Sequence, residues 1–222
     1  MTALLRYQAA LLLRSHRWLP PVLLYVVFLV VGVQGGQPIL DSLGYAAAAL
    51  LPATAWLVRI CVTNEPAAAR NCCAAATSPA RVHLACVLTA LGFAVALGTV
   101  ATLLVALISD PKSTDGQVRV PPLSAAGAGL LAMLACVLCG LAVGVLCNWP
   151  LLRSSGWAVL STMMAALMVL VVSGSPANAA MKGLVTGSAH GTVPMPLLPF
   201  VVGAVAAGAA TAVGCVLSSR RS

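Results

Sequence analysis

The segment RICVTNEPAAARNCCAAATSPARVHLA, residues 59–85, is the longest interruption between apolar runs on the positively charged side of the chain's predicted bundle. It contains Glu65, the only glutamate in the chain. Asn64 is a suitable N-cap for a helix. Glu65 and Pro66 suit a first helical turn, where an acidic side chain is favoured and an N–H is not needed. The pattern predicts a short helix over residues 64–77 that projects from the end of an apolar bundle.

The composition is that of an integral membrane protein. Of the 222 residues, 61% are hydrophobic and only 7% are charged, and the mean hydropathy is +1.03. Soluble domains carry about 25% charged residues. So few charges cannot cover a water-facing surface, and the apolar runs leave no stretch for a soluble domain. We therefore predict an all-α membrane bundle that forms one transmembrane domain over residues 1–222.

Six apolar runs are predicted to cross the bilayer, for which about 17 to 25 apolar residues are typical. The third is expected to begin with Ser78 as N-cap and Pro79 at the first helical position. It is longer than a crossing requires, which predicts tilt or an extension into water. The predicted crossings are residues 18–33, 43–62, 79–108, 125–147, 157–172 and 197–217.

The segment before the last crossing, residues 173–196, is too polar and too rich in glycine and proline to span a bilayer. It is nevertheless more apolar than an ordinary exposed loop. Short re-entrant or interfacial helices fit it, since irregular backbone is tolerated in a membrane where protein buries it. A loosely packed outer loop fits it equally well.

Residues 2–17 precede the first crossing and have two distinct faces. On a helix, Arg6, Arg14 and Arg17 fall within about 80° of one another, and four leucines lie on the opposite side. This pattern favours a helix in the membrane interface, with its cations toward lipid phosphates. Trp18, followed by two prolines, favours a bend into the first crossing. The alternative is a plain tail that extends the first membrane helix.

The distribution of charge predicts the orientation. Nine arginines fall on the side of the predicted bundle that carries both termini, and three basic residues fall on the other side. Because basic residues accumulate on the cytoplasmic side, both termini are expected in the cytoplasm. Ten of the twelve basic residues are arginine and alanine is abundant, which favours a high-GC bacterial source, so the expected location is a bacterial plasma membrane. The nine are Arg6, Arg14, Arg17, Arg59, Arg70, Arg81, Arg153, Arg220 and Arg221.

The sequence contains no recognisable catalytic or metal-binding motif. The sequence has no P-loop, no HExxH motif and no paired carboxylates, so we expect no catalytic residue, metal ligand or cofactor. Cys136 and Cys139 form a CxxC inside an apolar run, where close packing is the favoured interpretation. The basic residues are scattered singly, which argues against nucleic-acid binding.

The expected energy source lies outside the chain. Apart from Arg59 near a helix end, no ionisable residue is predicted in the middle of a crossing, and ion-driven carriers usually need such groups. The helices around a path for a substrate would offer Leu, Met, Ala and Thr, which favours a hydrophobic or amphipathic molecule. The residues expected along such a path are Thr54, Met163, Met164 and Met168.

The layout resembles the membrane subunit of an ABC-2 type (type V) ABC exporter. The residues that carry the resemblance are Glu65 and Arg70 in the short helix, followed by Ser78, Pro79 and Arg81 at the start of the next crossing. An amphipathic "elbow" helix precedes six crossings, as in that family. One departure is NCCAAAT in place of the family's usual Gly- and Leu-containing sequence.

The resemblance implies a mechanical role. Two such chains, identical or different, would form a twelve-helix dimer in the lipid bilayer, and the short helix would couple each one to a separately encoded ABC ATPase. ATP and magnesium would be bound by that ATPase. The exported molecule would be a drug, antibiotic, peptide or lipid-like compound. The rival interpretations are an ATP-independent carrier or channel, a membrane-bound enzyme, and a non-transporting immunity or scaffold protein.

Overall fold

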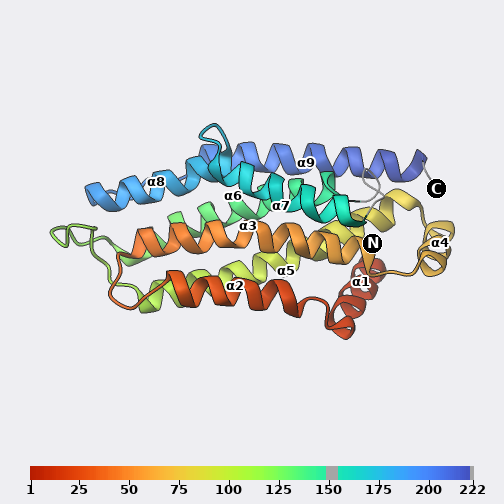
Figure 1. Ribbon diagram of the computed structural model, residues 1–222, viewed down its shortest axis with the longest axis horizontal. Helices are drawn as coiled ribbons and strands as arrows, with labels where there is room; N and C mark the ends of the chain where they lie inside the picture. Colours follow the sequence, from red (N-terminus) through yellow and green to blue (C-terminus); the bar gives the residue numbers. More distant parts are fainter. Residues whose placement is uncertain (149–154, 221–222) are drawn as a thin grey trace.

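The computed structural model of the chain describes residues 1–148 and 155–220. Within these residues the protein is all-α and forms an elongated bundle (Figure 1). The helices are α1 (Thr2–Ser15), α2 (Leu19–Gly32), α3 (Ile39–Thr63), α4 (Ala67–Ala76), α5 (Pro79–Ile108), α6 (Pro122–Leu146), α7 (Ser155–Val171), α8 (Pro176–His190) and α9 (Leu197–Arg220).

Four helices, α3, α5, α6 and α9, are long and apolar enough to cross a membrane by themselves. Two further crossings are formed only if a bent pair counts as one span. These pairs are α1 with α2, bent by 72°, and α7 with α8, bent by 42°. At 1.5 Å per residue, the 14-residue α2 is about 21 Å long, against about 30 Å of hydrocarbon. The described residues therefore give four to six candidate spans.

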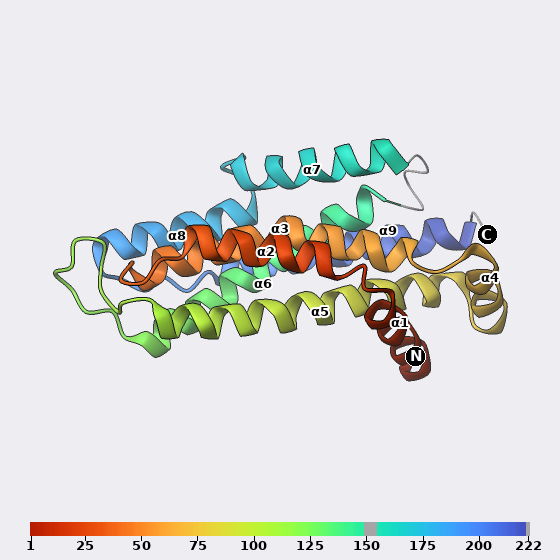
Figure 2. The same cartoon turned by 60° about the horizontal axis from the view of Figure 1, so that its bottom comes forward.

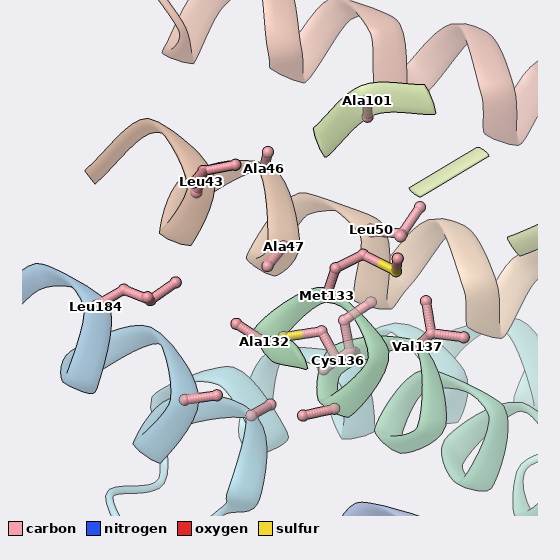
Figure 3. Close-up of a cluster of buried hydrophobic side chains, with 14 of the residues drawn as sticks. Leu43, Ala46, Ala47, Leu50, Ala101, Ala132, Met133, Cys136, Val137 and Leu184 are labelled. Atoms are coloured by element: carbon pink, nitrogen blue, oxygen red, sulfur yellow. The ribbon is translucent and has the colours of Figure 1, made fainter. Parts of the chain in front are cut away.

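The helices α3 and α6 form the centre of the bundle. About two thirds of the apolar window of each is buried (67% and 72%), against 28% for α5 and 22% for α9. Glycines allow this contact, because a Cβ on Gly140 would lie 2.5 Å from the carbonyl oxygen of Leu51, and one on Gly144 would lie 2.9 Å from that of Ala55. Small residues four apart on one helix face permit such a close contact. Figure 3 shows the apolar cluster around this contact, with Leu50 of α3 beside Met133 of α6.

The two ends of the bundle differ. One end, called here the α4 end, holds α1, α4 and the C-terminal end of α9, with both chain termini nearby (Figure 1). The other, the loop end, holds the loops 33–38 and 109–121. At the loop end Thr114 connects two helices, since its hydroxyl donates to Asp41 (3.1 Å) and lies 2.9 Å from the hydroxyl of Ser188. The described arginines at the α4 end are Arg6, Arg14, Arg17, Arg59, Arg70, Arg81 and Arg220.

Residues 173–196 are mostly helical rather than a loosely packed loop. The 15-residue α8 buries one face against the bundle, where Leu184 is fully buried, and the chain then folds back along α8. Gly187 permits this return, because a Cβ there would lie 2.5 Å from the carbonyl oxygen of Thr192. Figure 2 shows α7 on the outside of the bundle, where it contacts α3, α6 and α8.

Candidate functional site

The connection between α3 and α4 holds a buried carboxylate, the only one at the α4 end among the residues that the structure describes. Glu65 is only 3% exposed, and its Oε2 accepts a hydrogen bond of 3.0 Å from Nε2 of Gln8 on α1. Its Oε1 has no hydrogen-bond partner among the described residues. This donor helps to hold the carboxylate in place, since burying a charge is costly unless it is hydrogen-bonded. Glu65 therefore links α1 to the start of α4.

The predicted start of the short helix is wrong. The helix begins at Ala67, with Pro66 in the N-cap position, so that Asn64 and Glu65 lie before it. Asn64 still has the helical dihedral angles of α3, and its side chain donates to the carbonyl oxygen of Leu11 on α1 (3.3 Å) instead of capping α4. Both residues of the connection thus contact α1.

The helix α1 lies at the α4 end with its two faces as expected from their spacing. Leu12 is 1% exposed and packs into an apolar cluster with Val58 of α3 and Val87 of α5, and Arg6 and Arg14 on the other face are exposed. The helix ends before His16, whose φ of 55° turns the chain toward α2. Trp18 stands in the N-cap position of α2, and its indole N–H donates to the carbonyl oxygen of Leu13 (3.4 Å). Arg17, which was predicted on the same face, is exposed but lies beyond the end of α1.

Arg70 connects α4 to the end of α3. Its Nη2 donates to the carbonyl oxygen of Val62 (2.6 Å) and to that of Glu65 (3.3 Å). A cation at a helix C-terminus satisfies carbonyl groups that have no partner within the helix and stabilises the helix dipole. The three helices α1, α3 and α4 are therefore joined by side chains on both sides of Glu65.

The exposed side of α4 is small and uncharged. It presents Ala68, Asn71, Cys72 and Ala75, and Cys73 is half-buried on the other side. Burial and the nearby Glu65 carboxylate raise the pKa of the Cys73 thiol above its ordinary value.

The start of α5 is as predicted. Ser78 is its N-cap, with its hydroxyl accepting from the backbone N–H of Arg81 (3.3 Å), and Pro79 is the first helical residue. Arg81 is exposed one turn into α5. The five residues predicted for coupling, from Glu65 to Arg81, thus lie together at the α4 end.

The residues predicted for a substrate path are not brought together. Met163 lines a cavity of about 210 Å³ between α3 and α7, together with Trp56, Arg59, Val159 and Thr162. Thr54 does not line it: the side chain is fully buried, donates to the carbonyl oxygen of Leu50 (2.8 Å) and packs against Gly140. Met164 and Met168 are more than half exposed on α7.

Two polar residues near these sites have a role that the sequence did not predict. Gln8 lies between Leu4 and Leu12 on the apolar face of α1, and a polar side chain at that position is a signal that could have revealed it. Asn148 accepts from Nη1 of Arg59 (2.9 Å) and donates to the carbonyl oxygen of Gly144 (2.8 Å), which closes the C-terminus of α6. No sequence pattern identified Asn148.

Three comparisons with known proteins found no relative of this chain. No family model, no curated protein and no solved structure matches this chain.

Proposed function

We propose that this chain is the membrane subunit of an ATP-driven exporter and that α4 is its contact with a separate ATPase. The observation that carries the proposal is the hydrogen bond between Gln8 and the buried Glu65. Through this bond the connection that leads into α4, at one end of the bundle, is joined to the amphipathic helix α1 beside it. A displacement of α4 would therefore move α1 and the end of α3 with it.

Three features of the α4 end support a partner there. The exposed face of α4 is small and uncharged, so that it can enter a groove on another protein without clashes or charge burial. Arg70 fixes α4 to the end of α3, so that the helix proposed to contact the partner is held in one position. The arginines gathered at this end favour its location in the cytoplasm, where ATP is available.

In this proposal the chain moves the substrate and the partner hydrolyses ATP. The ATPase would hold ATP and magnesium, and its closure would push on α4. Two membrane chains would enclose the path, and both termini would lie in the cytoplasm of a bacterial cell. The exported molecule would be hydrophobic or amphipathic, in keeping with the apolar lining around Met163.

The proposal is tested by a substitution on the exposed face of α4. With a tag on the chain, we expect an ABC ATPase to co-purify from the native host. Ala75→Glu would place a charge on the contact face and reduce recovery of the ATPase at an equal amount of the membrane chain. Ala3→Glu, on the exposed side of α1, is the matched control and should recover it normally. Equal loss or equal retention in both variants would contradict a role for α4 in the contact.

A further inference from the structure

The connection between α7 and α8 lies at mid-depth in the bundle. Leu184 on α8 packs against Gly44 near the start of α3, and Ala177, two turns earlier in α8, belongs to the same apolar cluster as Cys139 on α6. The next residue, Gly140, contacts Leu51, which is the midpoint of the 25-residue α3. The break therefore lies near the centre of the bilayer if α3 spans it, and Figure 1 shows this connection between the two ends of the bundle.

The break exposes backbone at this depth. Residues 171–174 are all exposed, and Val172 is 51% exposed. Within the part of the chain that the structure describes, the backbone groups of Ser173 and Gly174 have no hydrogen-bond partner. Hydrocarbon does not tolerate such a segment, because lipid offers no hydrogen bonds. Irregular backbone occurs at this depth only where protein buries it or where it lines a water-filled cavity.

The neighbouring polar side chains hold the two helices together through hydrogen bonds, so the break is not a frayed helix end. Ser175 caps α8 by accepting from the backbone N–H of Asn178 (3.1 Å), and its hydroxyl donates to the carbonyl oxygen of Val169. Asn178 donates to the carbonyl oxygen of Leu170 (2.6 Å). Its own Oδ1 has no hydrogen-bond partner among the described residues, although the residue is only 6% exposed. A buried amide oxygen of this kind is satisfied in proteins by ordered water.

Polar side chains continue from this junction toward the loop end. Lys182, Thr186 and His190 follow one another at intervals of four residues on the exposed face of α8, opposite the buried Leu184. At 1.5 Å per residue, Lys182 lies about 9 Å beyond the start of α8, inside the outer half of a hydrocarbon core about 30 Å thick. A cation exposed at that depth is costly against lipid and marks a path or a water-filled cavity.

We propose that the α7–α8 break and the Lys182–Thr186–His190 face of α8 line a water-filled path. It opens at the loop end and reaches the middle of the bundle. This inference rests on the proposed transport function and narrows its substrate. A wall that presents backbone amides, a hydroxyl and an ammonium group suits an amphipathic molecule with a polar part, rather than a wholly apolar one.

Accessibility to water tests the path directly. Ser173→Cys in the full chain, in its native membrane, is treated with a charged, membrane-impermeant methanethiosulfonate from the loop-end side. Leu167→Cys is the matched control, because Leu167 is 57% exposed on α7 but lies outside the break. Both positions fall in the tryptic peptide of residues 154–182, which contains no native cysteine, so that mass spectrometry reads each label without interference.

Labelling of Ser173→Cys should be at least about tenfold faster than that of Leu167→Cys, because only a hydrated thiol ionises and the thiolate is the reactive form. Gly174→Cys serves as a second variant if the first does not fold, since a Cβ there meets no atom within 4 Å. Equal, slow labelling would overturn the path. So would cross-linking of two Ser173→Cys chains without labelling, because a second copy would then cover the break. Neither result depends on an ATPase, so the test is independent of the proposed energy source.

Discussion

The substitution Gln8→Leu should loosen α1 from the bundle. It removes the donor to Glu65 and leaves a carboxylate that is 3% exposed without that partner. A hydrogen bond to a charged group contributes about 1.5 to 3 kcal/mol, so we take a loss of about 2 kcal/mol. That raises the undocked population of α1 about 30-fold, since each 1.4 kcal/mol is a factor of ten. Leu12 remains to hold the helix, so the fold itself should survive.

Limited proteolysis measures this change. Trypsin cleaves after Arg14, which is exposed on α1. The backbone there must leave the helix to enter the protease. When this local opening is fast, the cleavage rate follows the population of the open state. The purified Gln8→Leu chain should be cut there about 30-fold faster than the wild type, by the same estimate. Gln117→Leu makes the identical change at an exposed position of the loop end and should leave the rate unchanged.

A double-substitution cycle separates the hydrogen bond from the general effect of a new leucine. In a Glu65→Leu background no carboxylate is left unpaired, so Gln8→Leu should change the cleavage rate far less than it does in the wild type. If Gln8→Leu accelerated cleavage no more than Gln117→Leu, or by the same factor in both backgrounds, the claim that this bond joins α1 to α4 would fail.

Two further outcomes follow from the same contacts. Gly140→Ala should lower the free energy of unfolding by about 1 to 3 kcal/mol, because its Cβ would lie 2.5 Å from the carbonyl oxygen of Leu51. Thermal unfolding in detergent measures this change. Gly92→Ala is the control, because no atom lies within 4 Å of its Cβ. The pKa of Cys73 is raised by burial and then by Glu65, so Glu65→Gln should shift its alkylation-rate profile to lower pH. An unchanged profile would mean that the carboxylate does not act on the thiol.

Features set by local composition could be predicted from the sequence. Apolar runs give the long helices, because a span needs length and hydropathy and nothing from elsewhere in the chain. The Ser78–Pro79 start of α5 follows from capping chemistry within four residues. The spacing of Gly140 and Gly144 likewise predicts a close contact on one face of a helix, although not which helix fills it.

Features set by distant contacts could not be predicted. Gln8 and Glu65 are 57 residues apart, and no local pattern pairs them. Asn64 is a good cap by type, but its contact with Leu11 places it in another role. Thr54 is expected along a path from its residue type, and only the packing of α3 on α6 decides that it faces Gly140. The depth of the α7–α8 break likewise depends on the packing of α8 against α3, where Leu184 lies beside Gly44.

The most direct test of the proposed function uses the native thiol of Cys72, which is exposed on α4. A photo-activated cross-linker attached there in membranes of the native host reports what touches this face of the helix. If α4 contacts the ATPase, we expect a cross-linked product that contains an ABC ATPase, and fewer such products after Ala75→Glu. Cross-links to lipid or to other copies of this chain, with no ATPase among the products, would contradict it.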